Sequence, residues 1–146
     1  PQSVTLVLEH DIDVSRGDMI ISADNRPGMS SELSARVCWM NPKPLQVGKK
    51  YFLKHTTATV QCVVTALEGK VNIQTFENEP ATELAMNDIG HVRLRTAKPL
   101  VFDGYTGNRL TGSFILVEQG TNHTVAAGML QPPTELVKPE YDDFTI

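Results

Sequence analysis

The glycines of residues 107–113 have the spacing that most suggests nucleotide chemistry. Gly107 and Gly112 are separated by four residues, and Ser113 follows, as in the phosphate-binding motif G-x-x-x-x-G-K-[ST]. The lysine that would reach the phosphates is missing, and the segment leads into a strand-like apolar run. Phosphate loops deliver their amides at the start of a helix, so we reject a nucleotide site here.

Other groups that could carry catalysis or hold a metal are dispersed. Asp11 and Asp13 have no third ligand nearby, so we interpret them as solvated turn residues. Cys38 and Cys62 each lie in a strand-like run, which favours buried structural thiols over a disulfide or a reactive thiol. The four histidines fall in separate predicted elements: His10, His55, His91 and His123. We therefore assign no catalytic, cofactor-binding or metal-binding residue.

The most suggestive charged cluster is a basic strand face. His91, Arg93 and Arg95 alternate with Val92 and Leu94, so the three basic residues share one face of a strand. One interpretation is an ordinary solvated face. The other is a docking surface for an acidic partner or a neighbouring domain, and the pattern leaves both open.

A second candidate surface is the long polar turn of residues 103–109, DGYTGNR. Tyr105 and Arg109 are its large side chains, and Tyr and Arg are the residue types that most often anchor interfaces. With His91, Arg93 and Arg95 they are our partner-contact candidates.

Short strands must position these side chains. Turn signals punctuate them: residues 68–69 predict a tight turn, Pro99 interrupts a strand, and residues 80–86 allow one helical turn. Many short strands without a long helix predict an all-β barrel or sandwich, and we expect a closed or nearly closed antiparallel barrel over residues 33–130. The expected strands are 33–40, 50–55, 57–67, 70–75, 91–96, 114–117 and 125–130.

The last two of these strands form a hairpin over residues 111–130, around which we expect the domain to be organised. Ala126, Ala127 and Gly128 are small, which would let another backbone come close. Alternation predicts a core made of Val37, Trp39, Val60, Cys62, Val64, Val92, Leu94, Phe114, Leu116 and Val125.

Composition narrows the classes of function. The chain of 146 residues carries a net charge of −4. Residues 131–146 supply −3 of it, so the body is near neutral, which argues against nucleic acid as a partner. Neither a membrane span nor a signal peptide is visible, which predicts a cytoplasmic location with no membrane partner.

Several motifs carry a family resemblance: residues 11–18 (DIDVSRGD), 35–40 (ARVCWM), 87–90 (NDIG) and 108–116 (NRLTGSFIL). The chain resembles the C-terminal part of the GTPase-type large subunit of bacterial sulfate adenylyltransferase, also found fused to an adenylylsulfate kinase. This resemblance implies a Greek-key-type β-barrel like the third domain of elongation factor Tu. It also implies three parts: residues 1–30 as the end of a second barrel, containing a short β-hairpin, plus a linker; 31–130 as the barrel; and 131–146 as a tail.

The resemblance also implies a role. The barrel would couple a separate GTPase domain, which holds GTP and Mg²⁺, to the small subunit that transfers adenylyl groups to sulfate. Neither the GTPase domain nor a kinase phosphate loop is expected within this chain. The alternative is a barrel of a translation-factor-type GTPase that contacts RNA.

Overall fold

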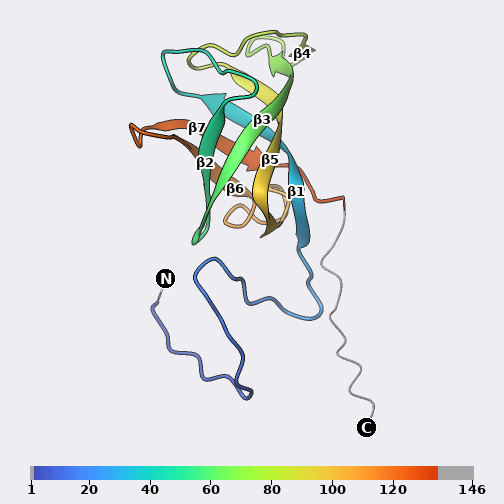
Figure 1. Ribbon diagram of the computed structural model, residues 1–146. Coiled ribbons are helices and arrows are strands. Elements are labelled where there is room, and N and C mark those ends of the chain that lie inside the picture. Colours follow the sequence, from blue (N-terminus) through green and yellow to red (C-terminus); the bar gives the residue numbers. More distant parts are fainter. Residues whose placement is uncertain (1, 135–146) are drawn as a thin grey trace.

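The computed structural model describes residues 2–134, and these form a single closed β-barrel with an extended N-terminal segment (Figure 1). Six strands close the barrel in the order β2-β6-β7-β1-β5-β3, and β3 pairs back onto β2. Every pairing is antiparallel. The strands are β1 (Gly28–Trp39), β2 (Lys50–His55), β3 (Ala58–Val71), β4 (Asn78–Glu79), β5 (Ile89–Phe102), β6 (Ser113–Glu118) and β7 (Thr124–Leu130).

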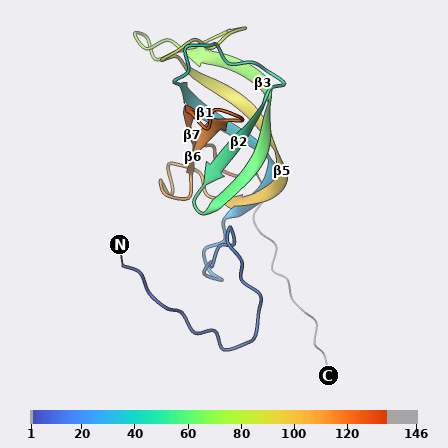
Figure 2. The same ribbon diagram turned by 60° about the vertical axis from the view of Figure 1, so that its left-hand side comes forward.

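The connectivity is a Greek key. The sequential strands β2, β3 and β5 are neighbours, and β1, which precedes them in the chain, lies beside β5. The strands wind around a common axis (Figure 2). The described residues contain no helix, and none of their elements could cross a membrane as a helix. The predicted all-β barrel of the Greek-key type is therefore confirmed.

Alternation of side chains builds the core as predicted. Ala35, Val37 and Trp39 of β1 are buried, and their neighbours along the strand point outward. Nine of the ten predicted core residues are buried, and Val60 is partly buried against the same cluster. Cys62 is an unreactive thiol, because burial raises its pKa to about 12 and keeps it protonated at neutral pH.

Several strand boundaries differ from the prediction, and the separate strand expected over residues 70–75 does not form. Glu68 and Gly69 do not form a turn: β3 continues to Val71 with a register shift beside Gly69, which has a φ of +150°. β5 likewise runs through Pro99, which lies in a bulge of β5: residues 96–99 stand between Arg95 and Leu100, whereas only one residue separates their partners Glu32 and Ser30 on β1. A bulge leaves local amides unpaired, so proline's missing N–H costs no ladder bond there. β1 begins inside the expected linker.

The N-terminal segment departs most from expectation. The β-hairpin predicted within residues 1–30 does not form: residues 2–20 contain no strand, and the single bridge joins Ser22 to Asn25. Val4, Leu6 and Val7 remain exposed. Two isolated strands bury too little apolar surface to be stable without further partners. The predicted tail of residues 131–146 lies mostly outside the described residues.

The closing hairpin packs differently from the prediction. Gly128 of β7 lies opposite Phe114 of β6, and a Cβ at Gly128 would stand 2.2 Å from Phe114 Cζ. The close approach that glycine permits is therefore by a buried aromatic ring, not by another backbone.

Loop residues seal one end of the barrel. Leu45 and Leu84 come from loops but are buried with Trp39 and Tyr51. The Leu45 amide donates to the Leu84 carbonyl at 3.0 Å, and the Leu84 side chain lies so close to Gly90 that a Cβ there would be 2.6 Å away. The helical turn considered for residues 80–86 is absent, and Leu84 plugs the barrel instead.

We predict that Gly128→Ala lowers the free energy of unfolding by about 1–3 kcal/mol, because Phe114 must leave its well-packed position. Urea denaturation of this chain measures the change. The exposed neighbour provides the control: Ala127→Ser should stay within about 0.5 kcal/mol of the parent. Equal stability of Gly128→Ala and the parent would contradict the packing.

Leu84→Ala should cost about 2–5 kcal/mol, since it empties a fully buried site at the end of the barrel. Met86 lies in the same segment and is half exposed, so Met86→Ala should cost far less. Thermal unfolding of both variants makes the comparison, and equal losses would show that Leu84 is not a plug.

Candidate docking surfaces

The basic strand face forms on β5, but its arginines are already paired. β5 lies between β1 and β3. The Arg95 Nε donates to Glu32 of β1, and the Arg93 Nε donates to Glu68 of β3, both at 2.5 Å. The side chains of these pairs are largely exposed, and exposed pairs contribute little to stability. The arginines can therefore exchange these partners for others at small cost.

His91 is not a cation of this face at neutral pH. Its side chain is half-buried opposite Arg36 of β1. Burial, with the neighbouring Arg36 charge, lowers the pKa of His91 below its usual value. Its Nε2 atom is buried without a hydrogen-bond partner among the described residues. The face is thus a ladder of mixed charges, and its contact with a partner stays a prediction.

The 103–112 loop is a braced structure at one end of the barrel. Thr111 Oγ1 donates to Asp103 Oδ2 at 2.6 Å, and Asn108 Oδ1 accepts from the Leu110 amide at 3.1 Å. The Tyr105 amide donates to the Leu130 carbonyl at 3.0 Å, which ties the loop to β7. Tyr105 is half-buried, whereas Arg109 and Leu110 project into solvent.

The glycines of this loop leave no room for a phosphate. The Gly107 amide donates to the Gly104 carbonyl at 2.9 Å, and the Gly112 amide donates to the Asn108 carbonyl at 2.8 Å. A Cβ at Gly112 would stand 2.4 Å from the Tyr105 Cα, so the loop backbone fills the space itself. The residues of this loop therefore do not fit a bound nucleotide.

A buried histidine fixes the loop to the barrel, and sequence reasoning missed it. His55 at the end of β2 is buried, and its Nε2 lies 2.7 Å from the Thr111 carbonyl oxygen. His55 continues the inward alternation of Tyr51 and Leu53 along β2. That period of two was visible in the sequence and would have placed this side chain inside.

The basic strand face borders a groove whose other wall is the segment of residues 131–134. Arg93 and Phe102 line it on the side of the barrel, and residues 131–134 line the other side. The Gln131 amide donates to the Ser34 carbonyl at 2.9 Å. Pro132 packs on Gly104, where a Cβ would be 2.8 Å from the Pro132 Cα. The 103–112 loop and the basic face thus flank the same short segment.

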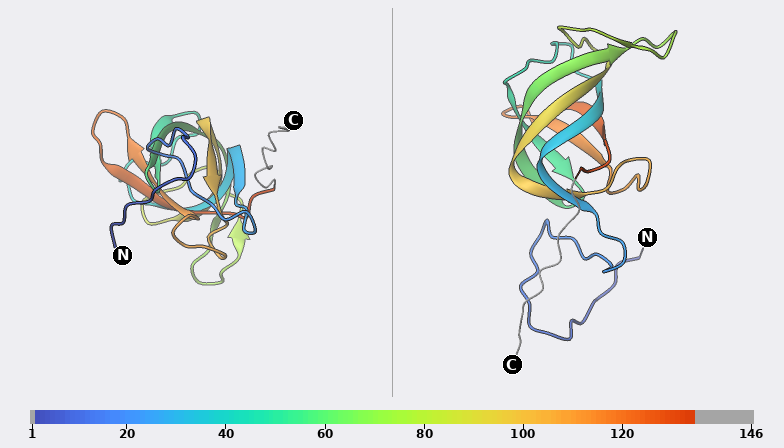
Figure 3. Two further views of the ribbon diagram at one scale, coloured as in Figure 1. Left: turned by 90° about the horizontal axis from the view of Figure 1, so that it is seen from below. Right: turned by 90° about the vertical axis from the view of Figure 1, so that its right-hand side faces the viewer.

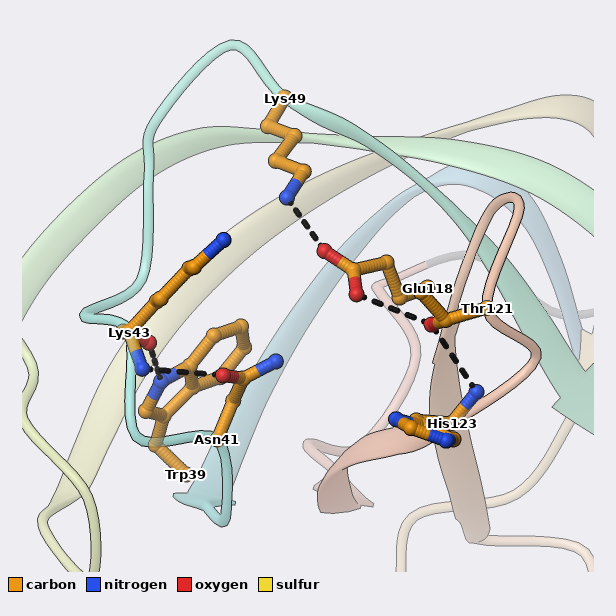
Figure 4. A network of polar contacts seen from close by, with 7 residues as sticks. All are labelled: Trp39, Asn41, Lys43, Lys49, Glu118, Thr121 and His123. Atoms are coloured by element: carbon orange, nitrogen blue, oxygen red, sulfur yellow. Dashed lines mark hydrogen bonds and ion pairs between the residues drawn. The ribbon is translucent and has the colours of Figure 1, made fainter.

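A polar network at the opposite end joins the 41–49 loop to the β6–β7 hairpin (Figure 4). Lys49 Nζ donates to Glu118 Oε1 at 2.7 Å, and Thr121 Oγ1 donates to Glu118 Oε2 at 3.0 Å. The hydrogen bond raises the pKa of Lys49 and lowers that of Glu118, so both stay charged at neutral pH. Trp39 Nε1 holds the same loop through the Lys43 carbonyl at 2.8 Å.

Metal-binding geometry is not found in the part of the chain that the structure describes. There, no group of three or more His, Cys, Asp or Glu side chains is arranged to hold an ion.

Comparisons with known proteins agree with this fold. Over 78% of this chain and 28% of the matched chain, the structure superposes on Sup35 complexed with GDP with a TM-score of 0.69 at 19% identity. The likeness at this identity concerns the fold alone.

Proteins of similar sequence identify the family more narrowly than the structural match does. The chain is 40% identical to sulfate adenylyltransferase subunit 1 of Shewanella woodyi over 99% of this chain and 32% of that protein. It is 46% identical to the bifunctional enzyme CysN/CysC of Mycobacterium tuberculosis over 89% of this chain and 22% of that protein. The chain therefore spans about a third or less of these relatives.

The family model described as GTP-eEF1A C-terminal domain-like matches residues 32–131. This range begins in β1 and ends just after β7, so it takes in at least part of all six barrel strands. The predicted resemblance is confirmed by relatives named for sulfate adenylyltransferase subunit 1. On its sequence and its fold, the chain belongs to the GTP-eEF1A C-terminal domain-like family.

Proposed function

We propose that this chain is the non-catalytic barrel region of a GTP-dependent sulfate adenylyltransferase large subunit, acting in sulfate assimilation in the cytoplasm. In this role it couples a separate GTPase domain, which binds GTP and Mg²⁺, to the small subunit that forms adenylylsulfate. The observation that carries the proposal is the 40–46% identity to proteins with these names over at least 89% of the chain.

The geometry supports a mechanical role. A switch in one domain reaches another site only through surfaces that differ in affinity between its states. A barrel closed by continuous pairing can move as one body and carry such a shift. The 103–112 loop is braced to β2 and β7, so a force on Arg109 would be passed to the barrel rather than absorbed by the loop.

The alternative, an RNA-contacting barrel of a translation factor, is less favoured. Phosphate contacts need an excess of positive charge on the binding face, whereas Glu68 and Glu32 lie beside Arg93 and Arg95 on this face and the chain carries a net charge of −4. The curated relatives reported above also carry names from sulfate activation.

We predict that Arg109→Ala or Tyr105→Ala in the full-length large subunit weakens association with the small subunit or uncouples GTP hydrolysis from adenylyl transfer. A central interface residue of these types is worth roughly ten-fold in affinity or more. Titration calorimetry measures association, and parallel assays of phosphate release and adenylylsulfate formation measure coupling. Arg109 is the cleaner site, because it is exposed and Tyr105 is half-buried.

Lys50→Ala is the matched comparison, because Lys50 is also exposed and cationic but lies at the other end of β2. Melting temperatures confirm that each variant is folded. If both loop variants assemble and couple normally, the 103–112 loop is not the coupling surface. Loss in Lys50→Ala alone would move the assignment to the 41–50 loop.

A further inference from the structure

The loop between β3 and β4 presents an aromatic side chain to solvent. Phe76 is 82% exposed, and Ile73 of the same loop is 69% exposed. Both side chains lie outside the core, and their loop is at the same end of the barrel as the 41–49 loop (Figure 1). A phenylalanine this exposed is a large apolar contact with nothing in the described barrel to cover it.

The exposure of Phe76 does not come from a loose loop. Asn72 organises the turn: its amide donates to the Glu77 carbonyl at 2.9 Å, its carbonyl accepts from the Phe76 amide at 2.7 Å, and its Oδ1 accepts from the Gln74 amide at 2.9 Å. Its Nδ2 donates to Glu79 Oε1 at 2.7 Å, which ties the loop to β4. The ring is therefore held out on a preorganised support.

The backbone at Phe76 is also unusual. Its φ is +60°, in the left-handed region that glycine and asparagine adopt readily and bulky side chains rarely adopt. An unstrained residue such as asparagine would suit the turn better. The fold thus tolerates an unfavourable residue at a position where an aromatic ring is exposed.

Charge around the ring indicates what it can meet. Residues 71–90 contain Glu77, Glu79, Glu83 and Asp88 but no lysine, arginine or histidine. The adjacent Lys70 pairs with Asp88 at 3.9 Å and lies opposite Glu79 in the β3–β4 pairing, and the charge of residues 70–90 remains negative. The three glutamates are exposed. An acidic rim repels anionic lipid and nucleic-acid phosphates, and it complements a protein pocket bordered by lysine and arginine.

Position separates this loop from the N-terminal segment. Arg16 Nε donates to the Thr57 carbonyl at 3.4 Å, so the segment meets the barrel at the β2–β3 hairpin. β4 and the loop before it lie at the opposite end of the barrel (Figure 3). A domain joined through residues 2–27 therefore approaches from the other side, which leaves the Phe76 end for a separate chain.

We propose that Phe76, supported by Ile73 and rimmed by glutamates, docks into an apolar pocket with a basic border on the small adenylyltransferase subunit. This inference rests on the function proposed above and names one of its interfaces. Aromatic anchors seated in a pocket and ringed by polar contacts carry much of the affinity of such interfaces.

The test uses the full-length large subunit and the purified small subunit. Phe76→Asn removes the ring but suits the left-handed backbone, so the variant should melt at the parent's temperature or above. Its dissociation constant for the small subunit should rise at least ten-fold.

Glu77→Lys should also weaken binding and flatten the dependence of affinity on salt. Thr65→Asn, at an exposed position of β3, should bind like the parent.

The outcomes separate this inference from the proposed function. Parent-like affinity of Phe76→Asn, while the parent protein binds the small subunit, overturns the Phe76 interface and leaves the proposed function standing. Failure of the parent itself to bind overturns both. A change in the self-association of the large subunit alone, seen by sedimentation velocity, would assign the ring to contacts between copies and also overturn the inference.

Discussion

Pairing of β2 along both of its edges is the constraint on which the structure depends. β2 hydrogen-bonds β3 on one side and β6 on the other, and this turns a twisted sheet into a closed barrel. Closure removes free edges from the six barrel strands, which protects them from pairing with other chains. It also defines an interior small enough for side chains to fill, so Leu53, Leu116 and Leu94 meet in one core.

Closure leaves two ends, and each end is finished by a different device. At one end Leu84 and Leu45 insert from loops beside Trp39, whose ring meets Tyr51 edge-on at 5.9 Å. At the other end the buried His55 holds the 103–112 loop by its Thr111 carbonyl. Loops fixed in this way become precise surfaces, and function in such folds resides in loops carried by a rigid scaffold.

The candidate surfaces on the sheet differ from those on the loops. On the outer face of β5, arginines and glutamates from neighbouring strands satisfy one another. The loops instead present exposed side chains: Arg109 and Leu110 at one end of the barrel, and Phe76 at the other. Partner binding at the loops costs no internal ion pair, so a coupling module of this kind is expected to work through its ends.

The sequence by itself determined the six barrel strands and the inward faces of nearly all of them, because alternation and turn residues are local signals. Its motifs also indicated the family. The sequence also indicated candidate contact residues, Tyr105 and Arg109 among them, whose role stays a prediction. Only the tertiary structure decided the bulge at Gly69, the burial of His55 and Leu84, and the pairing of Arg93 and Arg95. These depend on which strands become neighbours when the barrel closes, and closure joins residues far apart in the chain. The same reason explains the N-terminal segment: a strand-like pattern becomes a strand only where a partner strand is present.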